Sequence, residues 1–132
     1  VALTVDLRDV SSAVLDQLVA DLMQQLERIG VETGCPIQLK PQFEVAPTAA
    51  AGGVMAAIAS AAKDLGLSHS QLPSRASHDA QEIGRRWPMG MIVVPSRGGL
   101  GHSAKEFTSD EQCWAGTAVL LETLQRLDRD LP

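Results

Sequence analysis

Residues 91–95, MIVVP, form a continuous apolar run, and this run restricts the fold more than any other part of the sequence. A run without polar alternation is typical of a strand buried on both faces, as in a parallel sheet covered by helices. Such a strand needs neighbours on both edges, and the sequence offers few further strands to supply them. We therefore expect either oligomerisation through exposed strand edges or a partner segment that completes the sheet.

The first third of the chain has the pattern of half-buried elements. Apolar and polar residues alternate over residues 1–8 and again over residues 37–45, which predicts two strands with one apolar face each. Between them, apolar residues recur at helical spacing over residues 14–29, with Ser11 or the next serine as the N-cap and Gly30 placed to end the helix. These patterns predict a β-α-β unit of a small open-faced α+β sandwich.

The composition changes at the stretch APTAAAGG, and we place a domain boundary near Pro47. The predicted domains are therefore residues 1–47 and residues 48–132. In the second domain, residues 53–65 predict an alanine-rich helix that Gly66 closes. Together with the buried strand, this helix predicts α/β architecture.

The last helix opens with the letters TSDE, which predict a capping box from Thr108 to Glu111. Its acidic first turn suits the helix dipole. The helical spacing predicts one buried face, made of Cys113, Thr117, Leu120, Leu121, Leu124 and Leu127.

Composition excludes several classes of function. The net charge is −5, and the 132 residues include only two Trp, two Phe and no Tyr, so neither a nucleic-acid surface nor an anionic-membrane surface is expected. No apolar run approaches the roughly 18 residues of a membrane span. Without a leader pattern the cytoplasm is the default location. Because the chain enters a strand pattern at its first residue, we expect it to be a fragment of a longer protein.

His102 is the first candidate for chemistry. It follows the predicted buried strand and a glycine turn, SRGGLG, and ligand sites of open α/β sheets lie beyond the carboxyl ends of the strands. Glycines allow the backbone to take positive φ and to aim the imidazole, which is the commonest metal ligand in proteins. The alternative is that His102 caps a helix or bonds to a carbonyl. From its spacing, Glu106 could orient the imidazole ring of His102 or only begin a helix.

His78 and Asp79 are the second candidate. Because they are adjacent, they point in different directions on any regular element and could serve as a pocket residue and a carboxylate that orients an imidazole. The alternative, which the spacing favours, is a helix N-cap at Ser77 or Asp79.

Several motifs in order carry a resemblance to a known family. They are a Ser-x-x-x-His-Asp-Ala loop, Pro-x-Gly-Met before the apolar strand, Val-Pro-Ser, a glycine turn into His-Ser-x-x-Glu, and a Thr/Ser-capped helix with Val-Leu-Leu. In these the chain resembles the C-terminal part of the N-carbamoyl-L-amino-acid hydrolase, allantoate amidohydrolase and β-ureidopropionase family, which are dinuclear-metal amidohydrolases of the aminoacylase and zinc-carboxypeptidase-like clan. The LTVDLRD segment and the helix after it resemble half of the family's lid, which is also its dimerisation domain.

The resemblance implies a role for each candidate residue. His102 would be the last metal ligand, and Glu106 would support its loop. The loop with Arg75, Ala76, His78 and Asp79 would bind the substrate, although Arg75 and Ser77 stand where the family commonly has glycines. Two divalent ions, zinc, manganese, nickel or cobalt, would be held mainly by ligands upstream of this chain, where the general base would also lie.

The predicted protein is thus part of a homodimeric amidohydrolase that cleaves the C–N bond of N-carbamoyl or ureido amino acids. Residues 1–47 would be half of the lid and residues 48–132 the end of the α/β catalytic domain. The small-molecule substrate would meet a complete site only when the missing N-terminal half or another chain is present, so the isolated chain should be inactive. Two alternatives are a non-catalytic binding or oligomerisation module and a peptidase or N-acyl-amino-acid hydrolase of the same clan.

Overall fold

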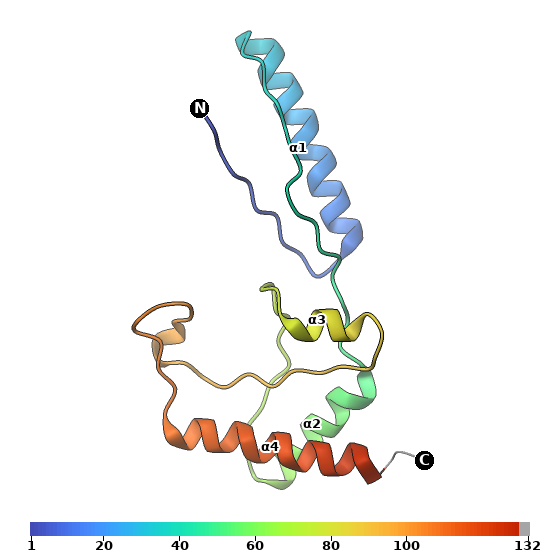
Figure 1. Ribbon diagram of the computed structural model, residues 1–132, viewed down its shortest axis with the longest axis vertical. Coiled ribbons are helices and arrows are strands. Elements are labelled where there is room, and N and C mark those ends of the chain that lie inside the picture. The colour runs from blue at the N-terminus through green and yellow to red at the C-terminus, as the bar shows by residue number, and fades with distance from the viewer. Residues whose placement is uncertain (130–132) are drawn as a thin grey trace. The chain divides into compact units, whose positions relative to one another are not determined.

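The computed structural model describes residues 1–129, and its regular elements are helices. In chain order these are α1 (Ser12–Thr33), α2 (Gly52–Asp64), α3 (Asp79–Gly84), the short 3₁₀ helix η1 (Arg97–Gly99) and α4 (Asp110–Arg129) (Figure 1). The contacts divide the chain into two units. Unit 1 comprises Val1–Thr48 and Pro73–Ser77, and unit 2 comprises Ala49–Leu72 and the residues from His78 on.

Helix α1 dominates unit 1, and local signals set both of its ends. Ser11 is the N-cap, and its hydroxyl accepts a hydrogen bond from the Val14 N–H at 3.4 Å. The helix does not end at Gly30, as the sequence pattern predicts, but continues to Thr33. Gly34 then takes the left-handed conformation at φ 67°, which a glycine adopts without steric cost.

The three segments expected as strands, residues 1–8, 37–45 and 91–95, are not strands anywhere in the described part of the chain. In unit 1 the segment after α1 runs back along that helix (Figure 1). A strand exists only when its backbone groups pair with a neighbour, and no neighbouring strand is present among residues 1–129. The α/β detail of the prediction is therefore not confirmed.

Unit 2 is built on the contact between α2 and α4. Its buried core is small and consists of Ala61, Ala62, Val119 and Thr123. The alanine-rich helix expected at residues 53–65 is confirmed as α2, and Gly66 follows it at φ 69°. Because alanines project so little, α4 approaches α2 closely at this point.

The face of α4 predicted to be buried is in fact exposed. Cys113 and Thr117 are exposed, and so are three of the four leucines, at 49% for Leu120, 58% for Leu121 and 56% for Leu124. The helix instead turns Val119 and Thr123 toward α2. Helical periodicity alone does not say which of two apolar faces meets a partner, and the described chain offers α4 only one partner helix.

Residues 89–95 lie directly on the two helices of unit 2. The Ala51 N–H donates to the Met89 carbonyl at 2.8 Å, which ties the segment to the start of α2. Any Cβ added to Gly90 would lie 2.6 Å from Val54 Cγ1, so only glycine permits this approach. Ile92 packs against the core, whereas Val93 is 65% exposed. The expected burial of this segment on both faces is therefore not observed.

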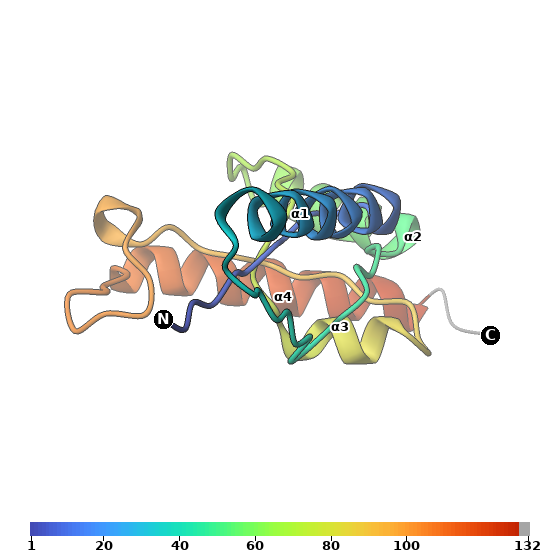
Figure 2. The ribbon, with the colours of Figure 1, turned by 90° about the horizontal axis from the view of Figure 1, so that it is seen from above.

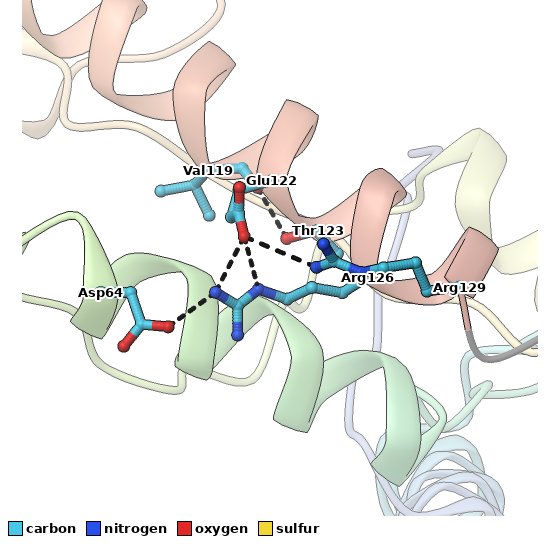
Figure 3. A network of polar contacts seen from close by, with 6 residues as sticks. All are labelled: Asp64, Val119, Glu122, Thr123, Arg126 and Arg129. Atoms are coloured by element: carbon cyan, nitrogen blue, oxygen red, sulfur yellow. Dashed lines mark hydrogen bonds and ion pairs between the residues drawn. The ribbon is translucent and has the colours of Figure 1, made fainter.

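Arg126 fastens the end of α2 to α4 (Figure 3). Its guanidinium donates to Asp64 Oδ2 at 2.6 Å across the helix pair, and to Glu122 Oε1 at 2.9 and 3.0 Å on its own helix. These hydrogen bonds, above all the one to Asp64, raise the pKa of Arg126 above its ordinary value. On the same stretch of α4, the hydroxyl of buried Thr123 donates to the Val119 carbonyl at 2.7 Å. None of the described helices is long and apolar enough to cross a membrane.

Candidate functional site

A loop of residues 96–107 positions His102. In both views this loop extends beyond the start of α4, on the side away from α2 (Figures 1 and 2). It begins with η1, where Gly98 and Gly99 have φ values of 66° and 67°. His102 itself has φ 55°, the only described non-glycine residue with positive φ. Residues other than glycine rarely adopt this backbone conformation, so a specific interaction must hold His102 in place.

Glu106 supplies that interaction. The backbone N–H of His102 donates to Glu106 Oε2 at 2.7 Å. The Glu106 carboxylate is itself brought into place by a turn, because the Glu106 N–H donates to the Ser103 carbonyl at 3.0 Å. The contact is therefore made to the backbone of His102. This differs from the interpretation that Glu106 orients the imidazole ring.

The loop also carries an open cavity of about 550 Å³. Two cations, Arg97 and Lys105, and the Glu106 carboxylate line it together with apolar atoms of Leu100 and Phe107. His102 is not one of the lining residues. The cavity therefore lies beside the candidate imidazole and does not enclose it.

His78 and Asp79 belong to unit 2 and form the start of α3. His78 is the N-cap residue, with extended φ and ψ of −137° and 150°, and Asp79 is the first helical residue. The Gln81 N–H donates to the His78 carbonyl at 2.9 Å. A helix start at this place agrees with the N-cap alternative, although the cap is His78 and not Ser77 or Asp79.

Arg75 and Ala76 belong to unit 1, and the first segment of the chain contacts Arg75. Arg8 Nη1 donates to the Arg75 carbonyl at 3.3 Å. Arg8 is oriented by Asp6, whose carboxylate accepts hydrogen bonds from Arg8 Nε at 3.0 Å and from Nη2 at 2.7 Å. The hydrogen bond from Arg8 lowers the pKa of the exposed Asp6 carboxyl below its ordinary value. The four residues expected to bind substrate are thus divided between the two units.

Sequence reasoning missed Arg8 as a neighbour of the Arg75 loop. The strand pattern predicts only that Asp6 and Arg8 share the polar side of residues 1–8, which is where a solvated ion pair would form. A contact between residues 67 positions apart has no local signal in the sequence. Arg97 and Phe107 were missed for a similar reason. The Arg97 guanidinium lies over the Phe107 ring, and this contact depends on how the loop between the two residues folds.

The candidate metal donors of the described chain do not converge on one point. Within residues 1–129 no group of three or more His, Cys, Asp or Glu side chains is placed to hold one. Glu106, the acidic residue in contact with His102, has an oxygen engaged by a backbone N–H. A metal centre needs three or more converging donors, so the described residues do not fit a metal ion by themselves.

Comparison with known proteins gives consistent matches. Residues 7–126 match the family described as Peptidase family M20/M25/M40. The allantoate amidohydrolase of Bacillus subtilis (strain 168) is 35% identical over 127 residues, which cover 96% of this chain and 31% of that protein. The N-carbamoyl-L-amino acid amidohydrolase of Geobacillus stearothermophilus is 34% identical over 127 residues, with coverage of 96% and 31%.

A solved structure agrees with these relatives. The crystal structure of an amidase of the hydantoinase/carbamoylase family from Burkholderia multivorans matches with a TM-score of 0.82 and 31% identity, over 88% of this chain and 28% of that chain. The chain thus spans about 31% of the length of the two relatives named above. The resemblance inferred from the motifs is confirmed.

Proposed function

Since this chain belongs to peptidase family M20/M25/M40, we propose that it supplies the His102 loop to an amidohydrolase that cleaves a non-peptide C–N bond. The proposed substrates are N-carbamoyl amino acids, ureido acids or allantoate. The names of the two relatives, an allantoate amidohydrolase and an N-carbamoyl-L-amino acid amidohydrolase, support this class. The observation that carries the proposal is the loop, which holds one imidazole-bearing residue in a left-handed conformation by means of Glu106.

Hydrolases of this family generally depend on divalent metal ions. Because the residues described here do not form a metal centre, we propose that the remaining ligands and the general base come from polypeptide outside this chain. Two ions per site, and their identity as zinc, manganese, nickel or cobalt, stay predictions. It follows that the 132-residue chain should not hydrolyse these substrates alone.

We assign substrate binding to the segment that contains Arg75, Ala76, His78 and Asp79. The charge of Arg75 supports this assignment. Arg75 adds a positive charge to this otherwise acidic protein, and a substrate carboxylate would be attracted to it.

The description of the family as peptidases favours one second candidate. In it, the same site hydrolyses a peptide or N-acyl amino acid. The two candidates differ in the group attached to the scissile nitrogen, and one assay with both kinds of substrate separates them.

A chimera provides the test. The 127 matched residues of the B. subtilis allantoate amidohydrolase would be replaced by this chain, and hydrolysis of allantoate, N-carbamoyl-L-amino acids and N-acetyl-L-amino acids would be followed by ammonia or acetate release. We expect ammonia release that the His102→Ala substitution abolishes. The matched control, His69→Ala, removes an exposed histidine of another loop and should leave the rate within about twofold, as for a surface substitution.

Three results would contradict the proposal. They are an unchanged rate in the His102→Ala chimera, preferential hydrolysis of N-acetyl substrates, and hydrolysis by the isolated 132-residue chain. The second of these would favour the peptidase or N-acyl hydrolase candidate.

A further inference from the structure

The two arms of the His102 loop are joined at its base. The Arg97 N–H donates to the Phe107 carbonyl at 2.8 Å. Next to it, the Ser96 hydroxyl lies 2.5 Å from the Leu100 carbonyl and 3.5 Å from the Phe107 carbonyl. One residue further out, the Thr108 hydroxyl donates to the Pro95 carbonyl at 3.1 Å. The loop is therefore closed by bonds among its own residues and their immediate neighbours.

A side-chain contact reinforces this closure. The Arg97 guanidinium lies over the Phe107 ring, 4.2 Å from its centroid. A cation at this distance from an aromatic face is attracted by the ring quadrupole. Arg97 and Phe107 are thus joined twice, by a hydrogen bond between their main chains and by a contact between their side chains.

We propose that Arg97 and Phe107 are positioning residues that clasp the base of the loop and thereby keep His102 in its left-handed conformation. A positive φ at His102 is strained, and strain persists only where the surroundings restrict the alternatives. When the base is closed, only residues 98–106 can rearrange. This lowers the number of competing loop conformations. The clasp depends on contacts within unit 2. Only the role of His102 in hydrolysis rests on the proposed function.

Amide hydrogen exchange of His102, measured by NMR on the 132-residue chain, reports on the clasp directly. The variant Arg97→Pro removes both the N–H that bonds Phe107 and the guanidinium, so its comparison with Arg97→Ala isolates the backbone hydrogen bond. Arg97 is the first residue of η1 and Ser96 before it is extended, at φ −107° and ψ 146°, so proline suits both positions. Arg97→Ala and Phe107→Leu remove the side-chain contact, and Arg97→Lys restores a cation.

The expected increases in His102 exchange follow from the strength of each contact. Loss of the ring contact in Arg97→Ala or Phe107→Leu should increase the rate about two- to fivefold. Loss of the backbone hydrogen bond, measured as Arg97→Pro against Arg97→Ala, should increase it about two- to tenfold more. Arg97→Lys should recover most of the protection lost in Arg97→Ala. The matched controls Arg85→Ala and Phe43→Leu remove an exposed arginine and an exposed phenylalanine elsewhere and should leave the rate unchanged.

The proposal is overturned if the His102 amide is unprotected in the unmodified chain, or if the clasp variants exchange no faster than the two controls. In the chimera, Arg97→Pro should lower kcat more than it changes KM, since it displaces His102 without removing a substrate contact. An inactive chimera would contradict the proposed function, whereas the exchange rates would still decide for or against the clasp.

Discussion

At the scale of single residues, the loop combines two kinds of left-handed residue. Gly98 and Gly99 adopt positive φ without steric cost. His102 adopts it although its Cβ then lies too close to the following carbonyl oxygen. The sequence predicts glycines that aim an imidazole, and the structure places positive φ at two of the three glycines of the turn, with Gly101 not among them. That the histidine itself would be left-handed has no signal in the sequence, because it depends on the carboxylate of Glu106.

Substitution of Glu106 tests this dependence. Glu106→Ala removes the acceptor of the His102 N–H, and we expect the His102 amide to exchange about tenfold faster, as for loss of one hydrogen bond to a charged group at an exposed site. Glu106→Gln keeps a side-chain oxygen and should stay within about threefold of the unmodified chain. Glu44→Ala, which removes an exposed carboxylate from the other unit, is the control. Equal exchange in all three variants would show that another interaction holds His102.

At the scale of elements, the helices could be predicted because their signals are local. A few adjacent residues determine each of these helix ends. Examples are the start of α1 at Ser11, the glycine after α2 and the serine that caps α4. The capping box of α4 is displaced by one residue from the prediction. The Ser109 hydroxyl accepts from the Gln112 N–H at 3.4 Å, while Thr108 is drawn to the Pro95 carbonyl. Sequence spacing fits both registers, and the contact of Thr108 with the neighbouring segment decides between them.

The cap predicts a difference between neighbouring substitutions. Ser109→Ala should destabilise the chain by about 1 kcal/mol in urea unfolding, as for loss of an N-cap. Thr108→Ala should cost less, because its hydroxyl bonds a loop carbonyl and not the helix. If Thr108→Ala is the more damaging substitution, the predicted Thr108–Glu111 box is correct and the register described here is wrong.

The same cap has a predicted dependence on pH. The Glu111 backbone N–H and the Ser109 hydroxyl lower the pKa of Glu111 below its ordinary value of 4.5. A carboxyl whose pKa is lower in the folded state stabilises the fold above its unfolded pKa, and this stabilisation is lost as pH falls through the folded value. The unmodified chain should therefore lose more unfolding free energy than Ser109→Ala between pH 6 and pH 3, a difference that urea titrations at both pH values measure. Parallel losses would show that Ser109 does not act on Glu111.

At the scale of the whole molecule, the apolar surface exceeds what the described contacts cover. On α4 the side opposite α2 carries Trp114, Leu120, Leu121 and Leu124, all 49% exposed or more, and Val93 is exposed on residues 91–95. The MIVVP run predicts burial on both faces, yet a strand and its covering layers require partners that residues 1–129 do not contain. The local helices were therefore predictable from this chain. The strands and the buried face of α4 expected from the sequence are not observed in residues 1–129, because both need partners that these residues do not supply.

This surface predicts that the isolated chain associates with itself. Contiguous apolar patches of several side chains are rare on monomers and drive association in water. We expect sedimentation velocity to show concentration-dependent oligomers, and the double substitution Leu121→Lys with Leu124→Lys to shift them toward the monomer. Both leucines lie away from the α2 contact, so the helix content measured by circular dichroism should stay the same. Gln24→Lys with Gln71→Lys adds the same charge outside α4 and should leave the oligomers intact, because it does not alter the apolar face of α4. A monomeric unmodified chain would mean that this face is stable in water without a partner.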